Sequence, residues 1–207
     1  SSDLHERILE SSIPLFAATG YEGVSMRDVA VAVKLTPAAL YYHFPNKEQL
    51  YVEAVTHAFR EVTGVLKAAI ESVSTPLEKL ESTIRATTQM FAGNKPLIRL
   101  IQWVKLDNKK QRRKELASSA LSELYSAVTT LVEGVGCRHY NSLIAVSIVS
   151  LVMFPFEVDD TLRVLPDYAP HSTDPKILTD HVMRVLRHGL TSYSGSSAPL
   201  TSFDGDG

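Results

Sequence analysis

The sequence predicts an all-α fold, because three features of it agree. Apolar residues recur at intervals of three and four along most of the chain. No long alternating run of β-branched residues occurs, and signals that start and stop helices separate the periodic segments. The 207 residues suit a small N-terminal domain joined to a larger helical one, and they can bury a core without disulfides or metal.

The N-terminal part of the chain predicts four helices with recognisable ends. Gly20 stands where a left-handed residue would end the first helix. Ser25 and Asp28 form a capping-box pattern for the second helix, and Asn46 with Gln49 repeats that pattern for the fourth. Thr36 and Pro37 are a cap and a first-turn proline for the third. The expected ranges are 4–19, 26–33, 37–44 and 46–72.

The remainder of the chain continues the helical pattern. Thr75, Pro76 and Glu78 start the next helix in the same way as the earlier caps. Further helices are expected at 76–93, 96–106, 110–133, 140–156 and 174–190. Residues 158–173, which contain two prolines, are expected to form a loop. The tail 194–207 is rich in Ser, Gly, Pro and Asp and is expected to be disordered.

Two short helices at 26–33 and 37–44, separated by a tight turn, predict a helix-turn-helix. The first half of the second helix must enter the major groove, where bulky apolar side chains would block approach. The run from Thr36 to Ala39 meets this demand because its side chains are polar or small. Leu40 and Phe44, four residues apart, would anchor the helix to the core. Tyr41 and Tyr42 cannot both be buried on one narrow stripe, so at least one must face outward.

The segments 20–30, 35–44 and 46–50 resemble the DNA-binding region of the TetR family of transcriptional regulators. The run Leu-Tyr-Tyr-His-Phe at 40–44, followed by Lys47, is specific to that family. The resemblance covers about a quarter of the chain, from His5 to Tyr51. Beyond Leu50 the family diverges, so no residue role carries over there. A structural helical hairpin in an unrelated protein is the alternative interpretation.

The resemblance implies a set of DNA contacts, residue by residue. The residue matching Ser25 caps its helix and touches a phosphate, and the residue matching Arg27 reaches the backbone or a base. The positions expected to face the major groove are Thr36, Pro37, Ala38, Ala39 and Tyr41. The positions expected to hold phosphates are Tyr42, His43 and Lys47. For His43 the plain alternative is an ordinary residue on the helix surface.

The sequence departs from the family pattern at Lys34, where glycine is common. If Lys34 adopts a positive φ, the strain costs on the order of 1 kcal/mol. A phosphate contact by its ammonium would compensate for this strain. Ala38 and Ala39 can touch thymine methyl groups but cannot read guanine. Specificity is therefore expected to depend on Arg27, Thr36 and Tyr41 and on DNA shape.

The overall charge gives no general support for DNA binding. The net charge is −2, and residues 1–60 hold five Lys or Arg against seven Asp or Glu. Affinity must then come from a local patch and from helix N-termini. The segment from Lys105 to Lys114 holds six cations and one acid, Asp107. It is interpreted as a solvated interhelical loop, although contact with DNA or an acidic ligand is the alternative.

No catalytic set, phosphate-binding glycine loop or metal-ligand cluster stands out, so the chain is expected to be no enzyme and to need no cofactor or metal. Cys137 and His139 lack further ligands and are interpreted as structural. The single cysteine and the lack of a signal-peptide pattern indicate the cytoplasm. The longest apolar stretch, 143–156, is interrupted and shorter than the roughly 20 residues that a bilayer needs, so no membrane partner is expected.

The expected domains are a DNA-binding domain at 1–45, a connecting helix at 46–72 and a ligand-binding and dimerisation domain at 73–193. The apolar helices at 140–156 and 174–190 would pair with a second copy as a four-helix interface. A pocket in this domain is implied by the resemblance. The candidate lining residues, each of which is otherwise a core residue, are Phe91, Trp103, Tyr125, Met153 and Phe154.

The resemblance implies repression from a pseudo-palindromic operator in double-stranded DNA, released by a small-molecule effector of unknown identity. The helix that starts at Asn46 would act as the lever, because it begins at the DNA and runs into the larger domain. Two other classes stay open. One is a DNA binder without an effector, and the other is a helical ligand-binding or interaction module without DNA binding.

Overall fold

The computed structural model describes residues 2–135, 141–166, 168 and 171–194, and these residues form helices and connecting turns without any strand. The prediction of an all-α fold is confirmed. The helices are α1 Ser2–Thr19, α2 Met26–Ala32, α3 Pro37–His43, α4 Lys47–Glu71, α5 Pro76–Gly93, α6 Lys95–Leu106, α7 Lys110–Leu116, α8 Ser122–Gly134, α9 Asn141–Leu162 and α10 Pro175–Ser194. A π-helical turn, Ala117–Leu121, joins α7 to α8.

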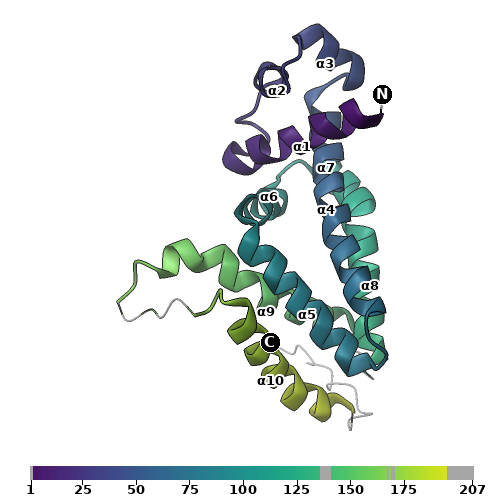
Figure 1. The fold of residues 1–207 in the computed structure, drawn as a ribbon, viewed down its shortest axis with the longest axis vertical. Coiled ribbons are helices and arrows are strands. Elements are labelled where there is room, and N and C mark those ends of the chain that lie inside the picture. The colour runs from purple at the N-terminus through teal and green to yellow at the C-terminus, as the bar shows by residue number, and fades with distance from the viewer. Residues whose placement is uncertain (1, 136–140, 167, 169–170, 195–207) are drawn as a thin grey trace, which may run out of the picture.

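Helices α1, α2 and α3 form a small unit at one end of an elongated molecule (Figure 1). Its centre is aromatic and aliphatic, and Ile8, Phe16, Leu40 and Phe44 are fully buried there. The ring of Phe16 meets the ring of Tyr51 edge to face, with 4.9 Å between the ring centres. Because Tyr51 belongs to α4, this core fixes the start of α4 to the three-helix unit.

Helix α4 runs from the three-helix unit to the opposite end of the molecule (Figure 1). It is 25 residues long, and it starts at Asn46, whose side chain accepts a hydrogen bond from Gln49 N at 2.8 Å. The capping box expected there is only half formed, because the Gln49 amide turns to Glu53 instead. Helix α4 packs against α1, α5 and α8, and so it belongs to both parts of the molecule.

The larger part of the molecule is built from α5 to α10. Helix α5 packs between α4 and α10, while α6 crosses beneath α1 and contacts α9 (Figure 1). The predicted capping box of α5 is present, since Thr75 and Glu78 bond to each other's backbone N–H groups. The helix expected at 110–133 is present as one continuous helical segment, 110–134, in which the π-helical turn separates α7 from α8.

The end of α9 differs from the prediction. The sequence places a loop from Val158, whereas α9 continues through Pro155 to Leu162. A helical proline costs only one backbone hydrogen bond and a local kink when packing holds the helix on both sides. Asp159, a mostly buried residue, accepts a hydrogen bond at 2.7 Å from Arg163 one turn later and stabilises the extension. The sequence patterns at Cys137 and in the tail 195–207 lie outside the described residues.

Helix α9 is also longer and more exposed than the sequence indicated. Its 22 residues have a mean hydropathy of 1.8 over an 18-residue window, and 28% of that window is buried. The sequence indicated an apolar stretch of 143–156, too short to cross a bilayer, but the helix that contains it has 22 residues and is long enough. One such helix is weak evidence for a membrane segment, because core and interface helices of soluble proteins have the same composition.

Candidate nucleic-acid interface

Helix α2 is held at its N-terminus by a reciprocal cap. The Ser25 hydroxyl accepts a hydrogen bond from Asp28 N at 3.2 Å, and the Asp28 carboxylate accepts one from Ser25 N at 2.8 Å. Hydrogen bonds from the Ser25 hydroxyl and then from its backbone N–H lower the pKa of Asp28. The predicted capping box is confirmed. It places the exposed Arg27 in the first turn of a rigid helix.

The turn between α2 and α3 depends on a left-handed residue. Lys34 has a φ of 59°, and among the described residues it is the only non-glycine with a positive φ. The turn closes with a hydrogen bond from Leu35 N to Ala30 O at 2.8 Å. The positive φ considered in the sequence analysis is therefore real. The exposed side chain of Lys34 lies at the edge of the helix-turn-helix.

Helix α3 presents small and polar side chains at its start. The Thr36 hydroxyl accepts a hydrogen bond from Ala39 N at 3.2 Å, and Pro37 occupies the first turn. Leu40 is fully buried and anchors the helix from below. Tyr42 is 87% exposed and Tyr41 is 48% exposed. Both tyrosines therefore reach solvent, which confirms that at least one of the pair must do so.

The predicted DNA contacts divide into two groups by exposure. The exposed residues are Ser25, Arg27, Lys34, Thr36, Pro37, Ala38, Tyr41 and Tyr42. The half-buried residues are Ala39, His43 and Lys47. All of them except Lys47 lie on α2, α3 or the cap and turn residues beside these helices. The structure thus brings the predicted set together on one unit, and their contact with DNA stays a prediction.

Lys47 is turned toward the protein. Its Nζ donates a hydrogen bond to the carbonyl oxygen of Tyr21 at 2.9 Å and lies 4.2 Å from the centre of the Tyr21 ring. An ammonium group has three donors, so one bond to Tyr21 leaves two for a phosphate. A phosphate contact by Lys47 therefore remains compatible with this position. The contact also makes Tyr21 a neighbour of the interface that the sequence analysis did not single out.

The cationic segment 105–114 is not simply a solvated loop. Residues 110–114 belong to α7, and the side chain of Arg112 is only 3% exposed. Arg112 forms a buried ion pair with Asp107 and stacks on Tyr21. The interpretation as a solvated loop is wrong for Arg112, because an acid five residues earlier and an aromatic ring from another element both face it. Along the sequence only the acid, Asp107, lies near Arg112, whereas Tyr21 is distant.

This ion pair has a clear electrostatic signature. Burial alone would raise the pKa of Asp107, but hydrogen bonds from Arg112 and from Lys109 N, together with the positive charge of Arg112, lower it overall. Burial, and then the negative charge of Asp107, raise the pKa of Tyr51 to about 12. At neutral pH Asp107 is therefore ionised and the Tyr51 hydroxyl is protonated.

An apolar cavity of about 70 Å³ lies between α4, α5, α8 and α9. Of the five predicted pocket residues, Phe91 and Met153 line it. The other lining residues are Val62, Leu66, Leu80, Thr83, Ile84, Thr87, Leu124, Val128, Leu131, Ile148, Val149 and Val152. By this measure one water molecule needs about 10–15 Å³, so the cavity has room for only a few groups of that size.

The three other predicted pocket residues lie elsewhere. The Trp103 indole nitrogen donates a hydrogen bond to Ala17 O at 3.2 Å, so this ring joins α6 to α1. The Tyr125 hydroxyl donates to the Ser142 hydroxyl at 2.8 Å on the surface. Phe154 is 59% exposed on α9. Trp103 lines a separate, open hollow between α1 and α6, so the predicted residues do not gather in one pocket. Helical spacing shows which side of a helix is apolar but does not show which neighbour that side meets.

A second, polar hollow of about 200 Å³ lies beside the apolar cavity, where α5, α6 and α9 meet. Phe91 lines both spaces. The polar hollow holds three cations, Lys95, Arg99 and Arg163, and three acids, Glu157, Asp159 and Asp160. Its charges are balanced, so it does not by itself favour an anion.

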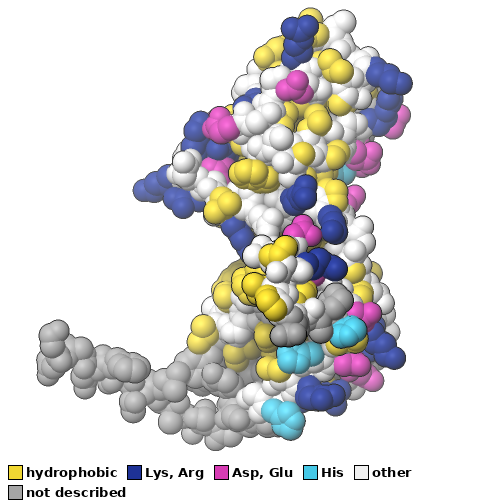
Figure 2. Space-filling model, turned by 90° about the vertical axis from the view of Figure 1, so that its left-hand side faces the viewer, with side chains coloured by type: hydrophobic (Ala, Val, Ile, Leu, Met, Phe, Trp, Pro, Cys, Tyr) yellow, Lys and Arg dark blue, Asp and Glu magenta, His cyan; other side chains and the backbone are white. Residues whose placement is uncertain are grey.

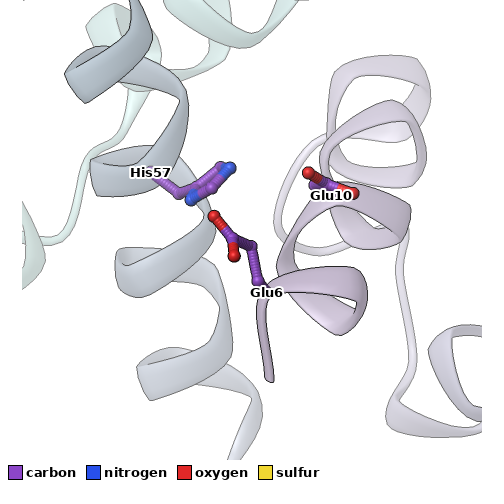
Figure 3. Close-up of side chains that lie close together, drawn as sticks. All are labelled: Glu6, Glu10 and His57. Carbon is purple, nitrogen blue, oxygen red and sulfur yellow. The ribbon is translucent and has the colours of Figure 1, made fainter. Parts of the chain in front are cut away.

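One group of side chains has metal-ligand chemistry. Glu6 and Glu10 of α1 face His57 of α4, and their ligand atoms lie within 4.8 Å of one another (Figure 3). His57 Nε2 is buried without a hydrogen-bond partner, although the whole side chain is 14% exposed. Both carboxylates are exposed, and exposed acids often lie close together without an ion. The group alone does not define a metal site, and we assign none.

The charged side chains are dispersed. On the face shown in Figure 2, Lys and Arg are interspersed with Asp and Glu, and no single basic patch covers the upper half. This agrees with the net charge of −2. Attraction of a phosphate backbone must therefore come from a few local cations and from backbone N–H groups at helix starts.

These features define a helix-turn-helix DNA-binding domain carried by a larger helical domain. A family model described as bacterial regulatory proteins, tetR family, matches residues 8–54. Residues 8–54 are thus similar to the DNA-binding region of the TetR family of transcriptional regulators, and this match covers about a quarter of the chain. The family that this region matches is one of bacterial regulatory proteins.

Curated relatives match the chain in its N-terminal part. The biofilm operon icaADBC negative transcriptional regulator IcaR of Staphylococcus epidermidis is 36% identical over 56 residues, which are 27% of this chain and 30% of that protein. The match thus spans about a third of the length of these curated relatives.

Two solved structures share the whole fold. AibR, in complex with isovaleryl coenzyme A and operator DNA, has a TM-score of 0.67 at 20% identity, over 86% of this chain and 96% of that one. FadR from Bacillus subtilis, in complex with stearoyl-CoA, has a TM-score of 0.73 at 16% identity, over 87% and 96%.

Proposed function

We propose that this protein is a dimeric transcriptional repressor that binds a pseudo-palindromic operator and is released by an acyl-coenzyme A effector. The observation that carries the DNA-binding part is the start of α3. Thr36, Pro37 and Ala38 are exposed there, while Leu40 and Phe44 below them are fully buried. A short helix held from beneath, with small side chains at its exposed end, can enter a major groove without a steric block.

Repression is the sign of regulation that the relatives favour. IcaR is a negative regulator, and its identity with this chain lies in the DNA-binding region. The proposed division of the chain keeps a DNA-binding domain at 1–45, a connecting helix at 46–72 and a ligand-binding and dimerisation domain at 73–193. The proposed location is the cytoplasm, where the operator lies.

A second copy of this chain is the proposed occupant of the exposed apolar face of α9 and α10. Its residues on α9 are Leu143, Val146, Val149 and Phe154, which are 39–59% exposed. Ile177 and Val185 of α10 are exposed as well. A face this apolar on two long helices suits a four-helix interface between two copies.

The effector class is proposed from the cavities and from the solved relatives. The lining of the cavity between α4, α5, α8 and α9 is almost entirely apolar and suits an acyl chain. The adjoining polar hollow, which shares Phe91, offers charged side chains of both signs to a head group, and Arg99 is one of its cations. AibR and FadR are described with isovaleryl and stearoyl thioesters of coenzyme A.

The proposed coupling is one of linkage. At about 70 Å³ the cavity does not accommodate a long acyl chain in its present form, so entry of one requires α4, α5, α8 or α9 to move. Because Val62 and Leu66 of α4 line the cavity, this movement passes to the helix that starts beside α3. An effector that favours the moved state weakens operator binding by the same factor by which DNA weakens effector binding.

The small cavity also favours a second candidate, a DNA binder without a small-molecule effector. In that case the cavity would be a packing defect. Regulation would then depend on the amount of the protein in the cell or on a protein partner. A helical ligand-binding module without DNA binding is the third class. Its support is the excess of acidic residues in the first 60 positions.

The first experiment is a binding selection of the purified protein against random duplex DNA at two salt concentrations. The test variant is Tyr42→Ala, and the control is Tyr125→Ala, an exposed tyrosine on the far domain. We expect a pseudo-palindrome that the control also selects and that Tyr42→Ala loses. Equal selection by both variants would place the DNA contacts elsewhere, and no enrichment for the unmodified protein would favour the module without DNA binding.

The recovered operator then tests the effector. Isovaleryl-CoA and stearoyl-CoA are titrated against the protein–operator complex, with free coenzyme A as the control. Release by a thioester but not by free coenzyme A is the expected result. Unchanged operator affinity with both thioesters would favour the binder without an acyl-CoA effector.

A further inference from the structure

One buried guanidinium group, that of Arg112, touches three separate parts of the molecule. Its Nη2 donates to Asp107 Oδ1 at 3.0 Å, and its Nε donates to Oδ2 of the same carboxylate at the end of α6. Its Cζ lies 3.8 Å from the centre of the Tyr21 ring, in the turn between α1 and α2. Its Nη1 lies 3.7 Å from Glu48 Oε1 in the first turn of α4.

These contacts require an arginine. A planar guanidinium can pair with a carboxylate through two nitrogens while its face covers an aromatic ring, whereas an ammonium acts as a point charge. The Arg112 and Asp107 side chains are each only 3% exposed, so the pair is screened little by salt. The position of Tyr21 is therefore tied directly to α6 and α7.

Tyr21 in turn touches a predicted DNA contact. Its carbonyl oxygen accepts the hydrogen bond from Lys47, and its ring lies 4.2 Å from the same ammonium. The Tyr21 ring also meets the buried Tyr51 ring, with 5.2 Å between centres. A displacement of Tyr21 would therefore change where Lys47 points and how the α1–α2 turn sits on the start of α4.

Arg112 lies on the same continuous helical segment, 110–134, that lines the apolar cavity. Leu124, Val128 and Leu131 of α8 line the cavity, and Arg112 lies at the other end of the segment on α7. The π-helical turn Ala117–Leu121 stands between them. Such turns interrupt the regular hydrogen-bond ladder and often occur where a helix must adjust.

We propose that Arg112 is a positioning residue, which holds Tyr21 and the helix-turn-helix in one orientation on the C-terminal domain and transmits movement of the segment 110–134 to it. This inference rests on the proposed DNA-binding function. Arg112 then provides a second connection between the C-terminal domain and the helix-turn-helix, in addition to α4. The two connections meet where Arg112 faces Glu48 of α4.

One donor of the Arg112 guanidinium is unpaired, and a possible acceptor lies close to it. Nη1 of Arg112 is buried without a hydrogen-bond partner, and Glu48 Oε1 is only slightly too distant to accept from it. A small approach of the first turn of α4 would complete this bond. A buried donor without a partner is costly, so this network favours a closer approach of α4 wherever the neighbouring helices allow it.

The test uses the full chain and compares Arg112→Lys with Arg113→Lys, the exposed arginine beside it on α7. Both variants keep the charge. The first readout is affinity for the operator recovered by selection, for which we expect Arg112→Lys to be weaker by about tenfold and Arg113→Lys by less than about twofold. Urea unfolding of each variant establishes that both are folded.

The second readout needs no DNA. Spin labels at Val31→Cys and Glu71→Cys, two exposed positions on α2 and α4, report the distance between the helix-turn-helix and the far end of α4. Cys137 is replaced by Ser, and labelled protein is diluted with unlabelled protein so that only distances within one copy are seen. We expect a broadened distance distribution for Arg112→Lys and an unchanged one for Arg113→Lys.

The two readouts separate the two proposals. If the unmodified protein selects no operator but Arg112→Lys broadens the distribution, the positioning role stands and the proposed function falls. If the operator binds and Arg112→Lys changes neither affinity nor distribution, the positioning role is overturned and the proposed function stands.

Discussion

The indole ring of Trp103 lies so close to Gly20 that a β-carbon at position 20 would come within 2.8 Å of two ring carbons. Gly20 also has a φ of 71°, which side-chain-bearing residues rarely adopt. This pair joins α6 of the larger domain to the end of α1. Close packing and backbone conformation thus both require glycine here.

Substitution of Gly20 by Ala is expected to destabilise the protein by about 2–4 kcal/mol, because strain at positive φ adds to the overlap with Trp103. Urea unfolding at neutral pH measures the loss. Gly64→Ala is the matched control, since a β-carbon there meets nothing within 4 Å and α4 gains helix propensity. A Gly20→Ala variant as stable as the Gly64→Ala variant would contradict the close approach.

The left-handed Lys34 allows a stabilising substitution. Lys34→Gly removes the steric cost of its φ of 59°, and we expect a gain of up to about 1 kcal/mol in the free energy of unfolding. Lys34→Ala retains the strain and serves as the control for loss of the ammonium. If Lys34→Gly proves less stable than Lys34→Ala, the turn does not need the left-handed conformation.

A negative charge at the start of α3 is expected to block DNA without harming the fold. Ala38 is exposed in the first turn of α3, where a carboxylate interacts favourably with the helix dipole. Ala38→Glu should therefore keep or slightly raise stability, yet weaken operator affinity by more than about tenfold through repulsion of phosphates. Fluorescence anisotropy with labelled operator measures this, and Ala68→Glu on the exposed side of α4 is the control. Equal losses in both variants would indicate a general charge effect.

The pKa of Asp107 predicts how stability depends on pH. Because its folded-state pKa is lowered from 3.8, the carboxylate binds protons less readily in the folded chain than in the unfolded one. Its contribution is therefore complete above the unfolded-state value and is lost as the pH falls through the lower folded-state value.

Substitution of Asp107 by Asn tests this sign. The variant is expected to be less stable than the unmodified protein at about pH 7, with a smaller difference at about pH 3. Urea unfolding at both pH values supplies the two differences. A gap that stays constant or widens on acidification would show that Asp107 is not held ionised by Arg112.

The proposed dimer makes a prediction about α9. Val146 is 56% exposed, and Val146→Glu places a charge in the apolar face, so the dimer dissociation constant should rise by more than about tenfold. Sedimentation equilibrium over a range of concentrations measures the change. Leu106→Glu, at a 73% exposed position on α6, is the control. A variant that remains as dimeric as the control would exclude α9 from the interface.

Much of the DNA-binding unit was predictable from the sequence because its signals are local. The caps at Ser25, Thr36 and Asn46 and the left-handed Gly20 depend on residues within four positions of each other. The anchoring role of Leu40 likewise follows from helical spacing.

The remaining features depend on contacts between distant residues. Trp103 was expected beside the other predicted pocket residues, but it packs against α1 and lines a separate hollow there, because periodicity gives the buried side of a helix but not its neighbour. Arg112 was grouped with solvated cations, because Tyr21, far earlier in the chain, supplies the ring that covers it. The end of α9 was misplaced because Pro155 is a stop signal that packing overrides.

The shortness of α3 limits how much sequence one copy can specify. Seven residues extend about 10 Å, which spans roughly three base pairs at about 3.4 Å each. A three-base-pair word recurs by chance about once every 64 base pairs, while a genome offers about a million or more competing positions. Two such words at a fixed separation recur by chance only about once every 4,100 base pairs. The rigidity that sets this separation therefore contributes to regulatory precision as much as a base contact does.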